Sequence, residues 1–262
     1  MPLSETTDVL SKIAAGVIYG SSAVNVIGYN GGVTTSAETI WDESSAYTFL
    51  TAAMSAPYIA SANVNDAAAG TGARTVRVTL VNTSFVQSTE DLTLNGQTGV
   101  SLVTANVLSI QKVEVLTAGS GLVNAGIIRI GTGVNTAGVP AVVHANVPAG
   151  LNASRHGFYV VPASNILLIQ HLRVASGSAT AGAITASIKE ASGLTGLVME
   201  KNIIMGTNND SISVDFKVPL AFPAQTKLNF QVISSAGTGP ASLLANCVLC
   251  DLTSTTGKAK WI

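Results

Sequence analysis

Short runs in which apolar and polar residues alternate make up most of the chain. Three such runs lie between Arg74 and Gly131, separated by Gly and Asn residues, and seven or eight more follow between residues 157 and 252. A period of two is the pattern of a strand with one buried and one exposed face. The pattern therefore predicts an all-β protein, folded as an antiparallel β-sandwich with a jelly-roll-like arrangement.

The first 20 residues carry the one pattern that predicts a helix. Val9, Leu10, Ile13 and Ala14 fall on one helical face, and Gly16 is placed to end the helix. One short amphipathic helix has little core to join, so we interpret this segment as an N-terminal arm.

Turn signals divide the remaining runs. Asn30-Gly31 predicts a tight turn between two short strands, and Asn95-Gly96 predicts a two-residue hairpin. Residues 61–73 and 134–152 are interpreted as irregular segments, the second because it contains Pro140 and Pro148.

These signals suggest four segments. Residues 1–60 form an N-terminal arm with short strands, 61–140 a first β unit, 141–253 a second β-sandwich unit and 254–262 a C-terminal tail. The alternative is a single sandwich to which both halves of the chain contribute strands. No period of about 20–50 residues indicates a repeat protein.

The chain contains few charged residues, and this bears on how much of its surface is exposed to solvent. Charged residues are 10% of the chain and aromatic residues 5%, while hydrophobic residues reach 47%. Average globular proteins have about 25% charged residues. A free monomer uses charge to stay soluble and to protect its strand edges. We therefore expect much of the surface to be covered by other subunits.

Charge and hydropathy also exclude some partners. The formal net charge is −1 and no basic run occurs, so nucleic acid is not an expected partner. No window approaches about 18 uninterrupted apolar residues, and the N-terminus lacks the basic leader of a secretory signal. We expect a soluble protein with no leader and no membrane partner.

Histidines and cysteines do not form a recognisable site. His144, His156 and His171 lack partners at metal-ligand spacing, and alternation places His171 on one strand face with Ile169 and Arg173. Cys247 and Cys250 lie three apart on a β-like run, hence on opposite faces, and are expected as buried or half-buried thiols. The sequence predicts no metal and no cofactor.

The carboxylates of the sequence do not indicate a catalytic site either. Asp42-Glu43 and Glu90-Asp91 are adjacent pairs whose members point apart on a strand, so neither makes an acid/base pair. Residues 63–66 and 208–210 offer oxygen ligands for Ca²⁺ but are interpreted as turns. We expect no catalytic residues, no small-molecule substrate and no enzymatic activity. A hydrolase would require distant carboxylates to converge.

Trp41 and Trp261 are the two tryptophans of the chain. An aromatic ring near a chain end can anchor on a neighbouring subunit. Both residues are therefore predicted as subunit-contact anchors.

Five short motifs resemble those of β-sandwich virion structural proteins of tailed bacteriophages, especially of the marine and cyanobacterial type. They are GARTVRV at 72–78, LNGQTGV at 94–100, TAGSGLVNAGII at 117–128, VVPA at 160–163 and DFKVPLAFP at 215–223. The resemblance covers about residues 70–252. It implies a component of a phage particle that is made in the host cytoplasm and located in the virion.

The expected function is a head decoration (cement) protein that acts through subunit packing. Its partners would be copies of itself, as a trimer, and other virion proteins such as the major capsid protein. A neck or tail accessory protein is the alternative. A receptor- or glycan-binding fibre module is another, because residues 140–157 hold His144, His156, Arg155 and Asn152 in loop-like sequence.

Overall fold

The computed structural model describes residues 9–177, 183–195, 198–206 and 211–253. These residues form one short helix and sixteen strands, and every pairing between named strands is antiparallel. The predicted all-β antiparallel class and the short N-terminal helix are confirmed.

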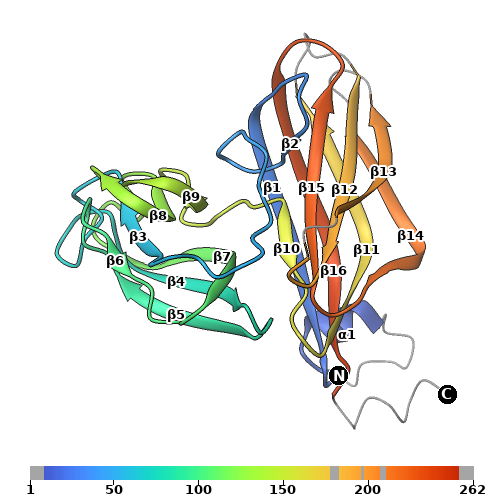
Figure 1. Cartoon of the computed structure of the whole chain (residues 1–262), viewed down its shortest axis with the longest axis horizontal. Coiled ribbons are helices and arrows are strands. Elements are labelled where there is room, and N and C mark those ends of the chain that lie inside the picture. The colour runs from blue at the N-terminus through green and yellow to red at the C-terminus, as the bar shows by residue number, and fades with distance from the viewer. Residues whose placement is uncertain (1–8, 178–182, 196–197, 207–210, 254–262) are drawn as a thin grey trace, which may run out of the picture.

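The strands form two sandwiches that lie side by side (Figure 1). One, the inserted sandwich, has a sheet of order β6-β3-β8-β9 and a sheet of order β5-β4-β7. Its strands are β3 (Tyr58–Ser61), β4 (Ala73–Asn82), β5 (Gln87–Thr93), β6 (Val100–Ser101), β7 (Val107–Ala118), β8 (Ile128–Thr136) and β9 (Val139–Val147).

The other, the terminal sandwich, contains both ends of the described chain. One of its sheets has the order β1-β16-β11-β14; the other has the order β10-β15-β12-β13, with β2 also paired to β15. Its strands are β1 (Ser21–Val33), β2 (Glu38–Thr39), β10 (Phe158–Val160), β11 (Asn165–Ser176), β12 (Ile184–Ser192), β13 (Val198–Gly206), β14 (Ser211–Phe222), β15 (Thr226–Ser234) and β16 (Gly239–Asp251).

The chain leaves the terminal sandwich after β2 and returns to it at β10. Strand β1 pairs with β16 from Ser21 opposite Cys250 to Val33 opposite Gly239. The sheets thus separate in the segment between β2 and β3 and in the segment between β9 and β10, not at the expected boundaries of residues 60 and 140. Residues 21–33 form one long strand of a sheet, where the sequence predicts two short strands. Alternation reports which face of a strand is buried but not which distant strand lies beside it.

The predicted turn at Asn30-Gly31 does not form. Strand β1 continues through it, and its pairing with β16 shifts between Asn30 and Val33, which is a β-bulge. The Asn30 side chain is buried, donates from Nδ2 to Glu38 Oε2 at 2.8 Å and accepts from Gly32 N at 2.9 Å. These contacts hold the strand extended where the local sequence favours a turn.

Two other local predictions also need correction. The Asn95-Gly96 turn forms, with Thr98 N donating to Asn95 O at 3.1 Å, but it links β5 and β6, which belong to different sheets. Residues 134–152, predicted as irregular, contain β9. Pro140 is tolerated there because β9 lies at the edge of its sheet, where a missing N–H costs little.

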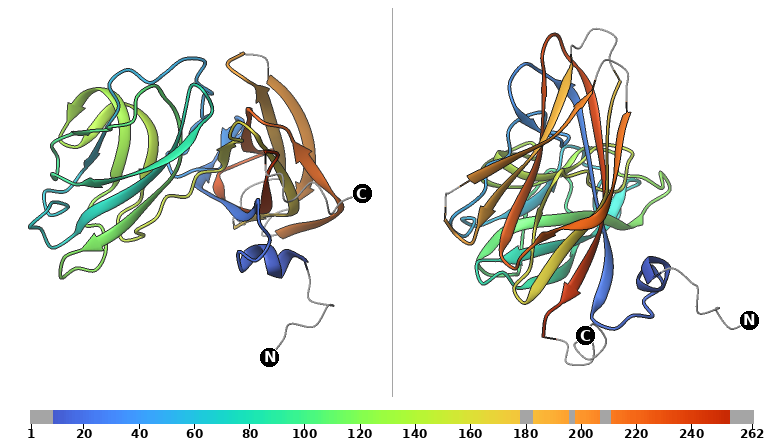
Figure 2. Two further views of the ribbon diagram at one scale, coloured as in Figure 1. Left: turned by 90° about the horizontal axis from the view of Figure 1, so that it is seen from below. Right: turned by 90° about the vertical axis from the view of Figure 1, so that its right-hand side faces the viewer.

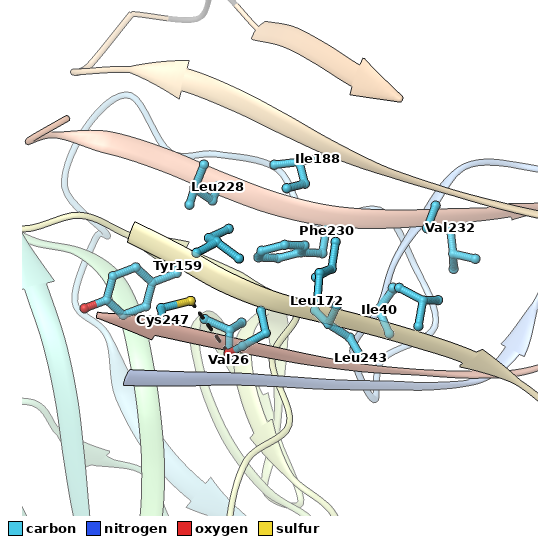
Figure 3. Packing of buried hydrophobic residues seen from close by; sticks show 14 of the residues in the cluster. Val26, Ile40, Tyr159, Leu172, Ile188, Leu228, Phe230, Val232, Leu243 and Cys247 are labelled. Atoms are coloured by element: carbon cyan, nitrogen blue, oxygen red, sulfur yellow. Dashed lines mark hydrogen bonds between the residues drawn. The ribbon is translucent and has the colours of Figure 1, made fainter. Parts of the chain in front are cut away.

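Each sandwich has its own apolar core. In the terminal sandwich, Leu228, Phe230 and Val232 of β15 alternate inward and meet Leu172 and other residues of the facing sheet (Figure 3). The core of the inserted sandwich is built mainly from β4, β7 and β8.

Among the described residues, helix α1 spans Val9–Ala14; residues 1–8 of the predicted segment lie outside the described part. It packs against β1, and only Ile13 of its side chains is buried. Gly16, with φ +70°, follows the helix in a conformation that favours glycine, as the sequence suggested.

Candidate functional site

The described residues include no group of three or more His, Cys, Asp or Glu residues that could hold a metal ion. No described helix combines the length and apolarity needed to cross a membrane. A cavity of about 10 Å³ lies in the core of the terminal sandwich, lined by residues that include Ile40, Leu172 and Phe230. Such a space is too small for any ligand larger than a single water.

Polar side chains concentrate where the two sandwiches meet. Arg155 bonds both carboxylate oxygens of Asp42, with Nε 3.1 Å from Oδ2. Glu43 Oε1 accepts from Arg129 Nε at 3.2 Å and from Asn146 Nδ2 at 2.7 Å. The adjacent carboxylates therefore have separate partners. Burial raises the pKa of Asp42, and the Arg155 guanidinium opposes that rise.

Aromatic rings surround these ion pairs. Trp41 meets Tyr47 and Phe158 edge-on at centroid distances of 5.6 and 5.8 Å, and Tyr47 stacks on Phe158 at 3.9 Å. Trp41 Nε1 donates to Ser45 O at 2.8 Å, and only 3% of the residue is exposed. The Trp41 ring thus contacts its own chain and is not available to a neighbouring subunit in this conformation. Trp261 lies outside the described residues.

The two histidines of residues 140–157 are not displayed to solvent. His156 stacks on Phe158 at 5.0 Å, and its Nε2 lies 3.1 Å from the backbone of Asn146. Burial lowers the pKa of His156 to about 4, against a smaller opposing effect of the Asn146 hydrogen bond. Burial also lowers the pKa of His144, which lies in β9. This segment therefore joins the sandwiches and does not present histidines to a receptor.

A second contact between the sandwiches was not predicted from the sequence. Val81, Phe85 and Leu108 of the inserted sandwich pack with Val160 of the terminal sandwich. Gln111 donates from Nε2 to Val160 O at 2.5 Å and accepts from Val160 N at 3.1 Å. Because a glutamine within a strand pattern looks like a solvent-facing position, alternation alone gives no signal for this contact.

Polar residues on the outer side of β15 hold the segment between β2 and β3. Lys227 Nζ donates to Leu50 O at 3.0 Å, and Asn229 Nδ2 donates to Tyr47 O at 3.1 Å. Burial lowers the pKa of Lys227. We call the following contacts together the junction of the sandwiches: these two bonds, the ion pairs of Asp42 and Glu43 with the rings beside them, and the contact at Val160.

Asp66 is a structural carboxylate. Its Oδ1 accepts from the backbone N–H groups of Ala73 and Ala125 at 2.7 and 2.8 Å, and its Oδ2 accepts from Gly126 N at 2.8 Å and Ser61 Oγ at 2.5 Å. Both oxygens are thus bonded to donors, which agrees with the turn interpretation of residues 63–66. Residues 208–210 lie outside the described part.

The carboxylates of β5 lie on an edge strand. Asp91 accepts two bonds of 2.8 Å from Arg77, and Glu90 Oε2 accepts from Val103 N at 2.9 Å. The two carboxylates thus bond to different partners, Asp91 to Arg77 and Glu90 to Val103.

His171 has a contact that resembles a catalytic pair. Its Nε2 lies 2.7 Å from Ser213 Oγ and 4.0 Å from Asp215 Oδ1. In a serine–histidine–aspartate triad the carboxylate binds the other ring nitrogen, and His171 Nδ1 has no hydrogen-bond partner among the described residues. The arrangement is therefore not a triad.

A register shift between Ile169 and His171 corrects the predicted alternation. It leaves Ile169 in the core and His171 and Arg173 on the outer face.

The cysteines match their prediction. Both are free; Cys247 is buried and Cys250 is partly exposed. Burial raises the pKa of the Cys247 thiol to about 12, which disfavours the reactive thiolate.

Comparison with known proteins adds little. No protein-family model matches the chain, and no curated protein matches it. Solved structures that it resembles include infectious bursal disease virus of the Gx strain (8% identity, TM-score 0.26), T=1 particles derived from infectious bursal virus (11%, 0.26) and the VP2 subviral particle of infectious bursal disease virus (12%, 0.23). Each match covers 88% of this chain and 69%, 66% and 70% of the other chain, respectively. Structural similarity with TM-scores this low supports no conclusion about the fold or the function of the chain.

Proposed function

We propose that this chain is a non-enzymatic structural protein of a virus particle that acts through the packing of subunits. Its finer assignment is a head decoration protein of a tailed phage, in contact with copies of itself and with the major capsid protein. The motifs at 72–78, 94–100 and 117–128 support the phage assignment by their resemblance. A neck or tail accessory protein is the alternative position.

The main support for this proposal is the strand order of the terminal sandwich. If β1, β10 and β11 to β16 are counted from one to eight, the two sheets have the orders 1-8-3-6 and 2-7-4-5. These orders support the jelly roll expected from the sequence, a double sheet of two Greek keys that viral capsid and lectin domains use. The inserted sandwich is then a projection held between the first and second strands.

Burial of the rings of Trp41, Tyr47 and Phe158 favours a particle protein over a glycan-binding protein. Trp41, Tyr47 and Phe158 are each less than 10% exposed, so these rings are not available to stack on a sugar. The low content of charged residues, 10%, points the same way because a surface poor in charge suits contact with other subunits. A glycan-binding fibre module has less support.

The test is to locate the chain on the particle. Particles of the virus that encodes the chain would be labelled with a gold-conjugated antibody against the purified protein and imaged by electron microscopy. Regular labelling of the heads supports decoration, and labelling at the neck or tail moves the assignment there. Unlabelled particles overturn the proposal, as does release of sugar when the purified protein is incubated with host polysaccharide.

A further inference from the structure

The ring of His156 contacts both sandwiches at the junction. It stacks on Phe158 of β10, with the ring centroids 5.0 Å apart, and it meets Trp41 edge-on at 6.3 Å. Its Nε2 lies 3.1 Å from both the backbone N and the backbone O of Asn146, which belongs to β9 of the inserted sandwich. Only 4% of the residue is exposed. A change in the charge of this ring therefore acts on the contact between the sandwiches.

The hydrogen bonds of His156 suit a neutral ring and not a charged one. A neutral imidazole has one donor and one acceptor, whereas a protonated imidazole has two donors. If Nε2 accepts from Asn146 N, protonation removes that acceptor. If Nε2 donates to Asn146 O, protonation adds an N–H at Nδ1, which has no hydrogen-bond partner among the described residues. In both cases protonation leaves one more buried donor without an acceptor, which is unfavourable.

A charge on His156 has no counter-ion in the described part of the chain. The titratable residues of the elements around the ring are Tyr29 of β1, Asp42, Glu43 and Tyr47 between β2 and β3, Arg129 of β8, His144 of β9, Arg155 beside His156, and Lys227 of β15. Each of the two carboxylates is already paired with one of the two arginines. The His156 ring contacts the Asn146 backbone and aromatic rings, and no described carboxylate. Burial accordingly lowers the pKa of His156 to about 4.

Each sandwich has a core that does not depend on the other. The segments 40–57 and 148–157 are the two connections between them (Figure 2). The buried residues of the apolar cluster that joins the sandwiches directly are Val81, Phe85, Leu108 and Val160, whereas each sandwich has a separate and larger core of its own. A small interface between two domains permits their relative motion. Loss of the junction contacts is therefore expected to separate the sandwiches without unfolding either one.

We propose that protonation of His156 opens the junction, so that in mild acid the inserted sandwich moves free of the terminal sandwich while both sandwiches stay folded. The chain then contains a pH-sensitive hinge between its two sandwiches, formed by the segments 40–57 and 148–157. This inference goes beyond the proposed function and does not depend on it.

Acid favours the open form because the ring binds a proton more tightly there. In the open form the ring is in water and its pKa returns to the ordinary value of 6.5, against about 4 in the closed form. The closed form is thus favoured above pH 6.5, and its share falls as the pH falls toward 4. The ratio of closed to open molecules should fall about 20-fold between pH 7 and pH 5. Burial raises the pKa of Asp42, so this carboxyl acts in the opposite direction and is not the trigger.

Hydrogen exchange of backbone amides in the purified full chain measures this ratio, once the rates are corrected for the intrinsic exchange rate at each pH. The N–H groups of Asn146 and Val160 face His156 Nε2 and Gln111 Oε1 across the junction. Their protection should fall together, by about 20-fold between pH 7 and pH 5. Amides in the centres of β4 and β12 should stay at least about tenfold better protected, because they exchange only when a sandwich unfolds. Junction amides as well protected as these core amides, or a fall confined to Asn146, would overturn the proposal.

Two variants attribute the effect to His156. His156→Gln retains a donor and an acceptor but does not titrate, so its junction amides should lose less than about twofold in protection. His171→Gln is the matched control, because His171 lies on the outer face of β11, where its Nε2 is 2.7 Å from Ser213 Oγ, and it should keep the wild-type fall. Circular dichroism checks that both variants fold.

Titration of the His156 ring by nuclear magnetic resonance in the wild-type protein gives a second measurement that needs no variant. Protonation of the ring and exchange of the Asn146 and Val160 amides should follow the same pH course. A ring that becomes protonated while these amides keep their protection would overturn the proposal, as would a 20-fold fall in His156→Gln.

Discussion

Several polar residues in the interior of this protein bond to partners far away in the sequence. Asp42 and Arg155 are separated by 113 positions, and Asn146 bonds to Glu43 across 103 positions. Asp66 accepts hydrogen bonds from residues up to 60 positions away. A buried polar group without a partner costs about 1–3 kcal/mol. These long-range hydrogen bonds therefore favour the native fold over arrangements of the chain in which the same groups are buried without partners.

His156 should make the stability of the protein depend on pH. Its pKa is about 4 in the folded chain against 6.5 for an unperturbed histidine, so between these values the unfolded chain binds a proton that the folded chain does not. Stability should therefore fall as the pH falls through this window, by up to about 3 kcal/mol. Urea unfolding at pH 7 and pH 4.5 should show a smaller loss for His156→Gln, by about 2 kcal/mol.

His144→Gln is the comparison for this measurement. Burial also lowers the pKa of His144, so its loss should change the pH dependence in the same direction. Equal pH dependence in the wild type and in His156→Gln would contradict the role given to His156.

Among the elements, β1 illustrates a close approach that only glycine permits. A Cβ atom on Gly28 would lie 2.2 Å from Ile40 O, because the backbone of Ile40 passes over the strand and accepts a bond from Gly157 N at 2.9 Å. Gly28→Ala should destabilise the protein by about 2 kcal/mol, since the backbone must move to make room. Urea unfolding measures this change.

Gly32→Ala in the same strand is the matched control. A Cβ there meets nothing within 4 Å, so its effect should stay within about 0.5 kcal/mol. A similar loss in both variants would mean that the effect comes from strand propensity and not from contact with Ile40.

The strands themselves were largely predictable, because alternation is a local property of the sequence. Where the alternation pattern predicts the wrong face or a turn that does not form, the cause is a register shift or a hydrogen bond of that strand. The register shift next to Ile169 moves His171 to the other face, and the bonds of Asn30 override its turn signal. Such features depend on what packs against the strand, which the pattern of one strand does not contain.

At the scale of the whole molecule, the pairing of strands and the junction were beyond the reach of sequence patterns. Ser21 and Cys250, which pair across β1 and β16, are 229 positions apart. The sequence predicts Trp41 as a contact to another subunit, but Tyr47 and Phe158 of its own chain pack against it, and it is buried. Nothing in the sequence around Trp41 identifies Phe158 as a neighbour.

The junction should make the two sandwiches unfold together. Gln111 bonds both backbone polar groups of Val160, the last residue of the edge strand β10, and thus takes the place of a neighbouring strand. Wild-type protein should show one calorimetric transition, and Gln111→Ala should split it into two, because two buried polar groups lose their partners at about 1–3 kcal/mol each. Gln87→Ala, at an exposed position of β5, should keep one transition. Two transitions in the wild type would mean that the junction does not couple the sandwiches.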